Sequence, residues 1–380
     1  MNSVCIIITG LSTGGAEAML FKLLQHLDRN RFTAQVISLS TKGEIGPRIE
    51  ALGVPVQALG MRPGLPNPGK CLRLIMTLRK MKPDVVQTWM YHADLVGGLS
   101  ARLAGIRAVV WGVRHSNLSP SLNKQTTLRV MHVCASLSRW LPCRILSCSE
   151  RARSIHVAAG YDAGKISIIP NGFDLEHFVP DEMARDSVRE EFGLPGDALL
   201  VGLIARDDPQ KNHAGFIEAA ARVKNSLPNV HFLLAGMGID EGNKPLVLAI
   251  ERAGLQNRVH LLGQRDDIPR LMAGLDVLAS SSHGEAFPNV LGEAMACGIP
   301  CVVTDVGDSA DIVGDTGRVV ASGDMADLAR RLIELLELPI EQRSALGRRA
   351  RERVRERYEI GEVVRRFEAF WAKAALANER

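Results

Sequence analysis

Short, continuous runs of apolar residues alternate with longer helical stretches along this chain, and this alternation limits its fold more than any other feature. The first run, residues 4–9, is followed by a glycine turn and then a helical stretch at residues 17–27. Runs that are apolar throughout are typical of parallel strands that helices cover on both faces. The sequence therefore predicts an α/β fold built from doubly wound sheets.

The alternation occurs twice, and 380 residues exceed the roughly 250–300 at which a single core stops growing. The first series predicts strands at 4–9, 34–39, 54–58, 84–88, 108–113 and 166–170, with helices at 17–27, 47–52, 71–81 and 94–104. The second predicts strands at 199–205, 230–235, 259–262, 277–280 and 301–303, with helices at 214–224, 245–253, 268–273 and 289–297. We expect one domain over residues 1–170 and another over 171–359, with residues 176–195 less ordered. A charged helical tail, 341–373, is expected to fold back on the first domain through its end, about residues 360–380.

Charge is distributed unevenly between the two halves. Residues 1–170 hold 21 Lys and Arg against 8 Asp and Glu, whereas the remainder holds 25 against 34. This asymmetry indicates that the basic half faces an anionic partner or surface, although uneven surface chemistry without a role is the alternative. The basic residues are not interleaved with aromatic ones on a recognisable module, so we expect no nucleic-acid binding. Seven scattered cysteines and no long apolar window lead us to expect a cytoplasmic protein with reduced thiols.

The strand expected at 277–280 leads into a loop and a helix that together predict a phosphate site. Pro288 suits the first position of that helix and Gly298 suits the position just after its end. Backbone N–H groups of residues 289–291 would then bind an anion at the helix N-terminus. Glu285, before the helix, and Glu293, one turn inside it, suit sugar hydroxyls on each side of a diphosphate. The alternative is a pair of solvated carboxylates.

Two further clusters of candidate site residues each follow the first strand of one of the two series. Arg206 and Lys211, after the strand at 199–205, would supply positive charge for a diphosphate leaving group, unless they are ordinary surface bases. Gly14 and Gly15, after the strand at 4–9, would let the backbone approach a ligand closely. The glycine turn alone is a weak signal, because it is not the G-x-G-x-x-G of dinucleotide enzymes.

Side chains at the carboxyl ends of two other strands point to the same edge of the first sheet. His115 follows the strand at 108–113 and is flanked by Arg114 and Asn117, while His92 follows the strand at 84–88. A histidine in such a position can hydrogen-bond a sugar or carry a proton. A satisfied structural histidine is the alternative for each. We expect His92, Arg114 and Asn117 on the acceptor side.

Taken together, the motifs resemble the family 4 retaining glycosyltransferases of the GT-B fold. The resemblance rests on Arg206 with Lys211, on Glu285 with Glu293, on the 14–17 opening (GGAE) and on the 170–174 turn (PNGFD). It covers nearly the whole chain in the right order. It implies two Rossmann-like doubly wound domains that face each other across a deep cleft, the first carrying the acceptor.

The resemblance also implies roles for individual residues. Glu293 would hold the donor ribose, Glu285 the donor sugar, and Arg206 and Lys211 the diphosphate, which Gly14 and Gly15 would approach from the first domain. His115 would lie near the reacting carbon. The remaining donor contacts would come from the backbone of Phe287, Pro288, Asn289 and Val290 and from the main chain near Arg265.

The implied reaction is a metal-independent transfer, with no cofactor, from a nucleotide-diphosphate sugar, for which we favour UDP. The acceptor would be a hydroxyl of a glycan or lipid-linked acceptor in envelope or exopolysaccharide synthesis, at the anionic inner membrane surface. Residues 123–148, which mix arginines with apolar residues, would form an interfacial or acceptor-gripping helix, or else a core helix. Alternatives are a nucleotide-sugar epimerase of the same architecture and a non-catalytic sugar-nucleotide-binding protein.

Overall fold

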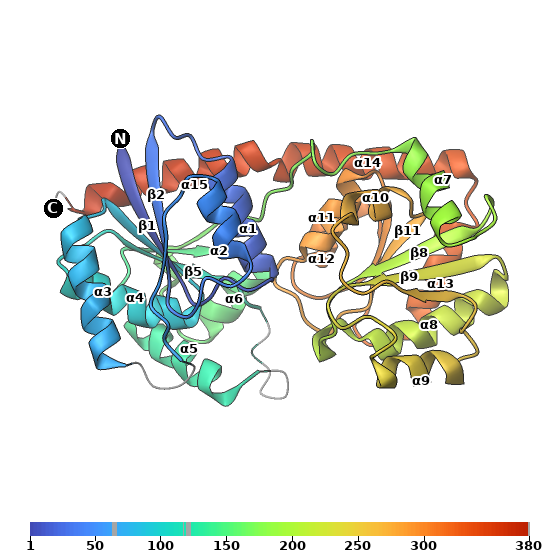
Figure 1. Cartoon of the computed structure of the whole chain (residues 1–380), viewed down its shortest axis with the longest axis horizontal. Coiled ribbons are helices and arrows are strands. Elements are labelled where there is room, and N and C mark those ends of the chain that lie inside the picture. Colours follow the sequence, from blue (N-terminus) through green and yellow to red (C-terminus); the bar gives the residue numbers. More distant parts are fainter. Residues whose placement is uncertain (63–66, 117, 119–122, 379–380) are drawn as a thin grey trace. The chain divides into compact units, whose positions relative to one another are not determined.

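The computed structural model describes residues 1–62, 67–116, 118 and 123–378, and the chain divides into two compact units (Figure 1). Unit 1 comprises Met1–Gly172 together with Ile360–Arg380, and unit 2 comprises Phe173–Glu359. The boundary lies two residues beyond the one expected from the sequence.

Unit 1 contains, within its described residues, a seven-stranded sheet in the order β3-β2-β1-β4-β5-β6-β7. All neighbouring strands in it are parallel. The strands are β1 (Asn2–Ile8), β2 (Phe32–Ser38), β3 (Val56–Ala58), β4 (Val85–Trp89), β5 (Val109–Val113), β6 (Arg144–Ser147) and β7 (Ile166–Ile168). The helices are α1 (Gly15–Gln25), α2 (Ile45–Ala51), α3 (Pro68–Met81), α4 (Tyr91–Leu103), α5 (Gln125–Leu137), α6 (Glu150–Ala158) and α15 (Ile360–Ala375).

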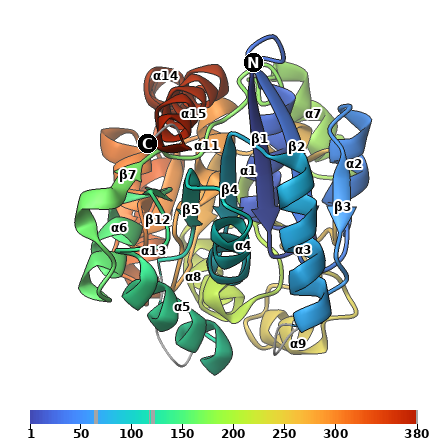
Figure 2. The ribbon, with the colours of Figure 1, turned by 90° about the vertical axis from the view of Figure 1, so that its left-hand side faces the viewer.

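Helices cover both faces of this sheet (Figure 2). Alternate residues of β1 point to opposite faces, so that Ile6 and Ile8 pack with α1, α2 and α15. Cys5 and Ile7 belong to the other core, with residues of α3, α4 and α5. The apolar run 4–8 of β1 follows from this double coverage, because both faces of the strand are buried there.

Unit 2 repeats the plan with a six-stranded parallel sheet, in the order β10-β9-β8-β11-β12-β13. Its strands are β8 (Leu199–Ile204), β9 (Val230–Ala235), β10 (Val259–Leu261), β11 (Val277–Ser280), β12 (Cys301–Thr304) and β13 (Arg318–Val320). Its helices are α7 (Glu182–Glu191), α8 (His213–Ser226), α9 (Lys244–Arg252), α10 (Ile268–Ala273), α11 (Asn289–Ala296), α12 (Ser309–Val313), α13 (Met325–Leu336) and α14 (Ile340–Tyr358). This strand order is that of a Rossmann sheet, so the predicted pair of doubly wound units is confirmed.

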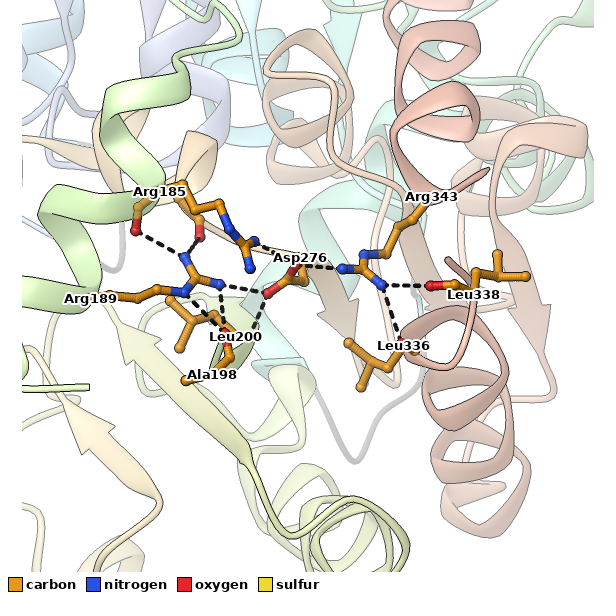
Figure 3. Close-up of polar contacts among 9 residues, drawn as sticks. Arg185, Arg189, Ala198, Leu200, Asp276, Leu336, Leu338 and Arg343 are labelled. Carbon is orange, nitrogen blue, oxygen red and sulfur yellow. Dashed lines mark hydrogen bonds and ion pairs between the residues drawn. The ribbon is translucent and has the colours of Figure 1, made fainter. Parts of the chain in front are cut away.

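The prediction that residues 176–195 are less ordered is wrong, because they contain α7. Asp181 caps this helix by accepting a hydrogen bond from the Met183 N–H at 2.9 Å. Figure 3 shows how α7 is fastened: Asp276, at the start of β11, accepts from guanidinium groups of α7 and α14. These groups belong to Arg185, Arg189 and Arg343, at 2.7–2.8 Å. The buried ion cluster adds to the packing of Ala184 and Val188, the buried apolar residues of α7.

The structure adds detail to two expectations for the C-terminal half. The second series of predicted elements ends at the strand 301–303, and the structure adds α12, β13 and α13 after it, within the expected domain. The expected packing of the C-terminal helix, about residues 360–380, in the first domain is confirmed, because α15 belongs to unit 1. The charged tail is not one helix, however, since α14 precedes α15 as a separate helix. The helix α14 stays in unit 2, where Arg351 donates to the Ala296 carbonyl of α11. Between them Glu359 is extended (φ −59°, ψ 134°), which breaks the helix.

Residues 123–148 do not form the single helix that was expected. They contain α5 and then, after a turn, the whole of strand β6, so Arg144 lies on a strand. Among the described residues, none of the helices combines the length and the apolar composition that a bilayer crossing requires.

Candidate active site

Loops that follow three neighbouring strands of unit 2 meet at the carboxyl edge of its sheet. Strand β11 pairs with both β8 and β12, so the loops after these strands lie side by side. Lys211 follows β8 and Glu285 follows β11, and the Lys211 ammonium lies 2.5 Å from Glu285 Oε1. After β12, Gly307 has φ +55°, and a Cβ there would lie 2.3 Å from the Glu285 carbonyl oxygen. The structure therefore brings Lys211 and Glu285 together, as the sequence predicts.

The helix α11 begins beside Glu285. Pro288 is the N-cap, in an extended conformation, and Asn289 is the first helical residue, so the proline lies one position earlier than expected. Gly298 does adopt the predicted conformation after the helix end, with φ +77°. Glu293 is the fifth helical residue and is half-buried. The prediction of an anion-binding N–H group is wrong for Leu291, whose N–H donates to the Pro288 carbonyl at 3.3 Å. The helix dipole still favours an anion at this N-terminus.

Three aromatic residues form a cluster that packs against α11. Phe173 and Phe287 stack with ring centroids 6.1 Å apart, and Tyr358 meets both rings edge-on. Gly292 lets the Phe173 ring approach α11, since a Cβ on Gly292 would lie 2.1 Å from that ring. Phe287 is therefore a buried packing residue whose side chain faces the core of unit 2.

Two neighbouring buried serines fasten the loops together. The Ser281 hydroxyl donates to the carbonyls of Lys211 and Asn212, at 2.9 and 3.1 Å. The Ser282 hydroxyl donates to Glu285 Oε1 at 2.8 Å. Our reading of the sequence missed both residues. The run of three serines that ends β11 is the only trace of them, and serine in a loop is too common to indicate such a role.

The other two predicted cations of unit 2 are engaged by carboxylates. Arg206 is half exposed and donates to Asp208 at 2.9 Å. Arg265 donates to Asp267 at 2.8 Å and to Glu191 of α7 at 2.9 Å. Hydrogen bonds from Arg265, and to a lesser extent from Arg270, hold the pKa of Asp267 well below its usual value. The Arg265 side chain is thus part of a surface ion network. The donor contact expected at this residue involves its main chain, which this network does not occupy.

In unit 1 the glycine turn lies at the start of α1, after β1. Gly14 is the N-cap and Gly15 the first helical residue. A Cβ on Gly14 would lie 2.4 Å from a Glu17 carboxylate oxygen, so the glycine gives room for the Glu17 side chain at the helix N-terminus. The acidic residue in this first turn suits the helix dipole.

The residues predicted at the carboxyl edge of the unit 1 sheet have different surroundings. His115 Nε2 lies 2.7 Å from Asn123 Oδ1, and its ring meets Tyr91 edge-on at 6.4 Å. His92 lies in the first turn of α4 rather than in a loop, and partial burial lowers its pKa. Asn117 lies outside the described residues.

Arg114 lies within the packing of unit 1 rather than on an open acceptor surface. Its guanidinium stacks 3.7 Å from the Trp89 ring and donates to Asn171 Oδ1 at 2.7 Å. Phe367 of α15 lies on the same group at 5.9 Å. Burial lowers the pKa of Arg114 to about 10. This geometry favours a structural role, in which Arg114 joins α15 and the end of β7 to β4.

Comparisons with known proteins agree with this fold. The family described as Glycosyltransferase Family 4 matches residues 13–177, and that described as Glycosyl transferases group 1 matches residues 184–353. Anabaena Alr3699/HepE, solved in complex with UDP, has a TM-score of 0.85 at 25% identity, covering 98% of this chain and 100% of that one. WaaG, a glycosyltransferase involved in lipopolysaccharide biosynthesis, has a TM-score of 0.74 at 18% identity, over 94% of this chain and 97% of its own.

Two curated relatives are also similar. The Escherichia coli UDP-Gal:alpha-D-GlcNAc-diphosphoundecaprenol alpha-1,3-galactosyltransferase is 30% identical over 245 residues, 62% of this chain and 61% of that enzyme. The match therefore spans less than two thirds of that relative. The putative glycosyltransferase EpsF of Bacillus subtilis is 28% identical over 331 residues, 80% of each chain.

Two Rossmann-like units, with a cation and a carboxylate at the start of a helix in the second, define a glycosyltransferase fold of the GT-B class. The two family matches cover nearly all of the chain. The chain belongs to family 4 of the glycosyltransferases.

Proposed function

We propose that this chain transfers a sugar from a UDP-sugar to a hydroxyl of a lipid-linked or polysaccharide acceptor, with retention of configuration. The observation that carries the proposal is the Lys211–Glu285 pair at the N-terminus of α11. A cation, a carboxylate and the positive end of a helix dipole are what a diphosphate joined to a sugar needs at its two ends. UDP is favoured because HepE was solved with UDP and the E. coli relative uses UDP-Gal.

In this proposal Glu293 holds the ribose and Glu285 the sugar, while Arg206, Lys211 and the α11 N-terminus bind the diphosphate. Gly15 approaches the diphosphate, His115 lies at the sugar, and the main chain near Arg265 meets the base. Each positive group must leave its present carboxylate to do this: Lys211 leaves Glu285, and Arg206 leaves Asp208. Stabilising the leaving diphosphate in this way requires no metal ion.

The proton of the acceptor hydroxyl goes to the departing phosphate oxygen as the new glycosidic bond forms on the same face of the sugar. The carbon–oxygen bond to the phosphate breaks in that step. Glu285 is consequently a sugar-binding group and not a nucleophile, and its charge is needed to accept hydrogen bonds from sugar hydroxyls.

Contact with an anionic membrane surface also belongs to the proposal. Helices α3, α4 and α5 of unit 1 pack side by side and expose large apolar residues. These apolar residues are Leu72, Met76, Leu99, Leu103, Val133 and, just after α5, Trp140, which is 77% exposed. Exposed Arg73, Arg79, Arg102 and Arg139 lie among them. Apolar and basic side chains on one face suit a surface of anionic lipid.

Binding of vesicles tests this surface. Trp140→Ala with Leu103→Ser should lower co-sedimentation with phosphatidylglycerol vesicles several-fold, and high salt should lower it further. Met183→Ser is the matched control, because Met183 is 80% exposed on α7 of unit 2. Equal binding by all three proteins would exclude this face.

The donor proposal is tested by ligand-dependent stability and by transfer. UDP should raise the melting temperature more than GDP or ADP, because only a ligand that binds the native state stabilises it. Transfer from a UDP-sugar should persist in EDTA. Lys211→Ala and Glu293→Ala should abolish transfer without lowering the melting temperature of the unliganded protein. Wild-type turnover in either variant, or activity that only magnesium restores, would contradict the assignment.

A further inference from the structure

Ser282 lies in the loop after β11, three residues before Glu285, and only 3% of the residue is exposed. Its hydroxyl donates to Glu285 Oε1 at 2.8 Å, the same oxygen that meets the Lys211 ammonium at 2.5 Å. The neutral Ser282 hydroxyl and the charged Lys211 ammonium therefore both contact Glu285 Oε1. The Glu285 side chain is only 11% exposed, so water does little to orient this group.

The backbone that carries Ser282 is itself held on two sides. Its carbonyl accepts from the Thr304 hydroxyl of β12 at 2.7 Å. The next residue, His283, donates its N–H to the Gln210 carbonyl at 2.7 Å, and Ser281 holds the Lys211 carbonyl. These bonds fix the Ser282 hydroxyl relative to both β8 and β12, so it is a rigid reference point for the Glu285 carboxylate.

The two donors on Oε1 differ in what a bound sugar nucleotide would do to them. A diphosphate competes for the Lys211 ammonium, because phosphate oxygens attract the charge that Glu285 now neutralises. It has no comparable effect on a neutral, buried hydroxyl. A hydroxyl also holds the carboxylate without neutralising it, so the charge stays available for sugar hydroxyls.

We propose that Ser282 is a positioning residue that keeps Glu285 directed at the donor sugar when Lys211 turns to the diphosphate. This inference rests on the proposed function. It assigns Ser282 to the sugar end of the donor only, so Ser282 determines how well the sugar is held for reaction, and it does not contribute to affinity for the nucleoside diphosphate.

The test compares Ser282→Ala and Ser282→Cys with a matched loss of a buried hydroxyl elsewhere in unit 2. Thr316→Val is the control, because Thr316 is 3% exposed and its hydroxyl donates only to the Val313 carbonyl, at 2.7 Å. The measurements are the Kd for UDP, and kcat and KM for the UDP-sugar. Ser282→Ala should leave the UDP Kd within about twofold and lower kcat/KM about tenfold or more, as expected for a lost hydrogen bond to a charged group.

Ser282→Cys, with a weaker donor of similar size, should fall between Ser282→Ala and the wild type, while Thr316→Val should match the wild type in kcat/KM. If Ser282 acts through Glu285, then adding Ser282→Ala to Glu285→Gln should change kcat/KM by less than about twofold. The same decrease in both backgrounds would overturn the inference. A fall in UDP affinity that equals the fall in kcat/KM would also overturn it, as general damage to the site.

Failure of the proposed function gives a different result. If the wild type neither binds UDP nor transfers from any UDP-sugar, the proposed function fails and the inference fails with it. If the wild type binds UDP and transfers sugar while Ser282→Ala has wild-type kcat/KM, the proposed function stands and only the assignment of Ser282 is wrong.

Discussion

Asp94 is a carboxylic acid buried completely in the core of unit 1. It accepts hydrogen bonds from the Thr88 hydroxyl and from the Gly112 N–H, the latter at 3.2 Å. Through Gly112 it holds β5, two residues before Arg114 and three before His115. Burial raises the pKa of Asp94 from 3.8 to about 8, so the folded protein holds a proton there at neutral pH that the unfolded chain has released.

The Asp94→Asn variant should be more stable than the wild type, by a margin that grows with pH. The folded pKa of Asp94 is raised, so the wild type loses stability as pH rises from about 4 to about 8, by about 1.4 kcal/mol per pH unit for this group. Asparagine has nearly the same shape and takes up no proton on folding. Urea unfolding at pH 5 and pH 7.5 measures the difference.

Comparison of the two proteins at each pH removes the contributions of other groups. His156 is such a group: burial lowers its pKa to about 4, so it lowers stability as pH falls through the range from 6.5 to about 4. Tyr91 and Cys134, which also face Asp94, have raised pKa values and stay neutral throughout this range. A margin that is constant with pH, or larger at pH 5, would contradict the assignment of a neutral Asp94.

The site residues whose positions could be predicted are those that local sequence places at the end of a strand. Lys211 and Glu285 each come just after a buried strand, and neighbouring parallel strands bring such loops together. Arg114 also follows a strand, yet its side chain lies between Trp89 and Phe367. Phe367 is more than 250 positions away in the sequence, so nothing local to Arg114 could indicate that it would be buried. Ser282 is only three residues from Glu285, but serine in a loop is too common to indicate the hydrogen bond between them.

At the scale of elements, the strands could be predicted because their apolar runs are strong and local. The helices that were missed depend on contacts made elsewhere. In α7 the buried residues are few and include Arg189, whose partner Asp276 lies just before β11. A sequence window over α7 shows a polar segment. Only the three-dimensional arrangement shows that a carboxylate from another element makes an arginine compatible with the core.

Gly292 in α11 provides a test of how this helix is supported. Glycine-to-alanine exchange within a helix is usually stabilising by about 1 kcal/mol. Here the added Cβ would lie 2.1 Å from the Phe173 ring, so Gly292→Ala should instead destabilise unit 2 by about 1–3 kcal/mol. It should also weaken UDP binding, because α11 must move away from Phe173 and carries the proposed phosphate-binding N–H groups.

Phe173→Leu is the partner change for this prediction. A smaller side chain at residue 173 leaves room for the new methyl group, so Phe173→Leu combined with Gly292→Ala should recover part of the lost stability and UDP affinity. Chemical unfolding and titration with UDP measure both. Purely additive losses in the double variant would show that the Phe173 contact does not position α11.

At the scale of the whole molecule, unit 1 is not one continuous stretch of the chain, because it includes the C-terminal helix. The helix α15 comes last in the sequence, yet Phe367, Phe370 and Trp371 complete the core of unit 1 beside β1 and β2. The Trp371 indole donates to Gln87 Oε1 at 3.1 Å. Charge in the tail indicated a helix but not its division at Glu359, because the assignment of α14 to unit 2 depends on contacts such as that of Arg351 with α11.

The four tryptophans of the chain, Trp89, Trp111, Trp140 and Trp371, all lie in unit 1, so tryptophan fluorescence reports on that unit alone. Trp371→Ala removes a fully buried side chain and should cost about 3–5 kcal/mol in the unfolding of unit 1. In urea, the remaining three tryptophans should report unfolding at a clearly lower concentration than in the wild type. Far-UV circular dichroism should then retain a second transition, from unit 2.

UDP should distinguish these two transitions, because the proposed donor site is built mainly from unit 2. At about one hundred times its Kd, UDP should add about 2.7 kcal/mol to the stability of the unit that binds it. In Trp371→Ala the later, circular-dichroism transition should move to higher urea, while the earlier fluorescence transition moves less. A single transition seen alike by both probes would mean that the units unfold together. In that case α15 would stabilise the whole chain and not unit 1 alone.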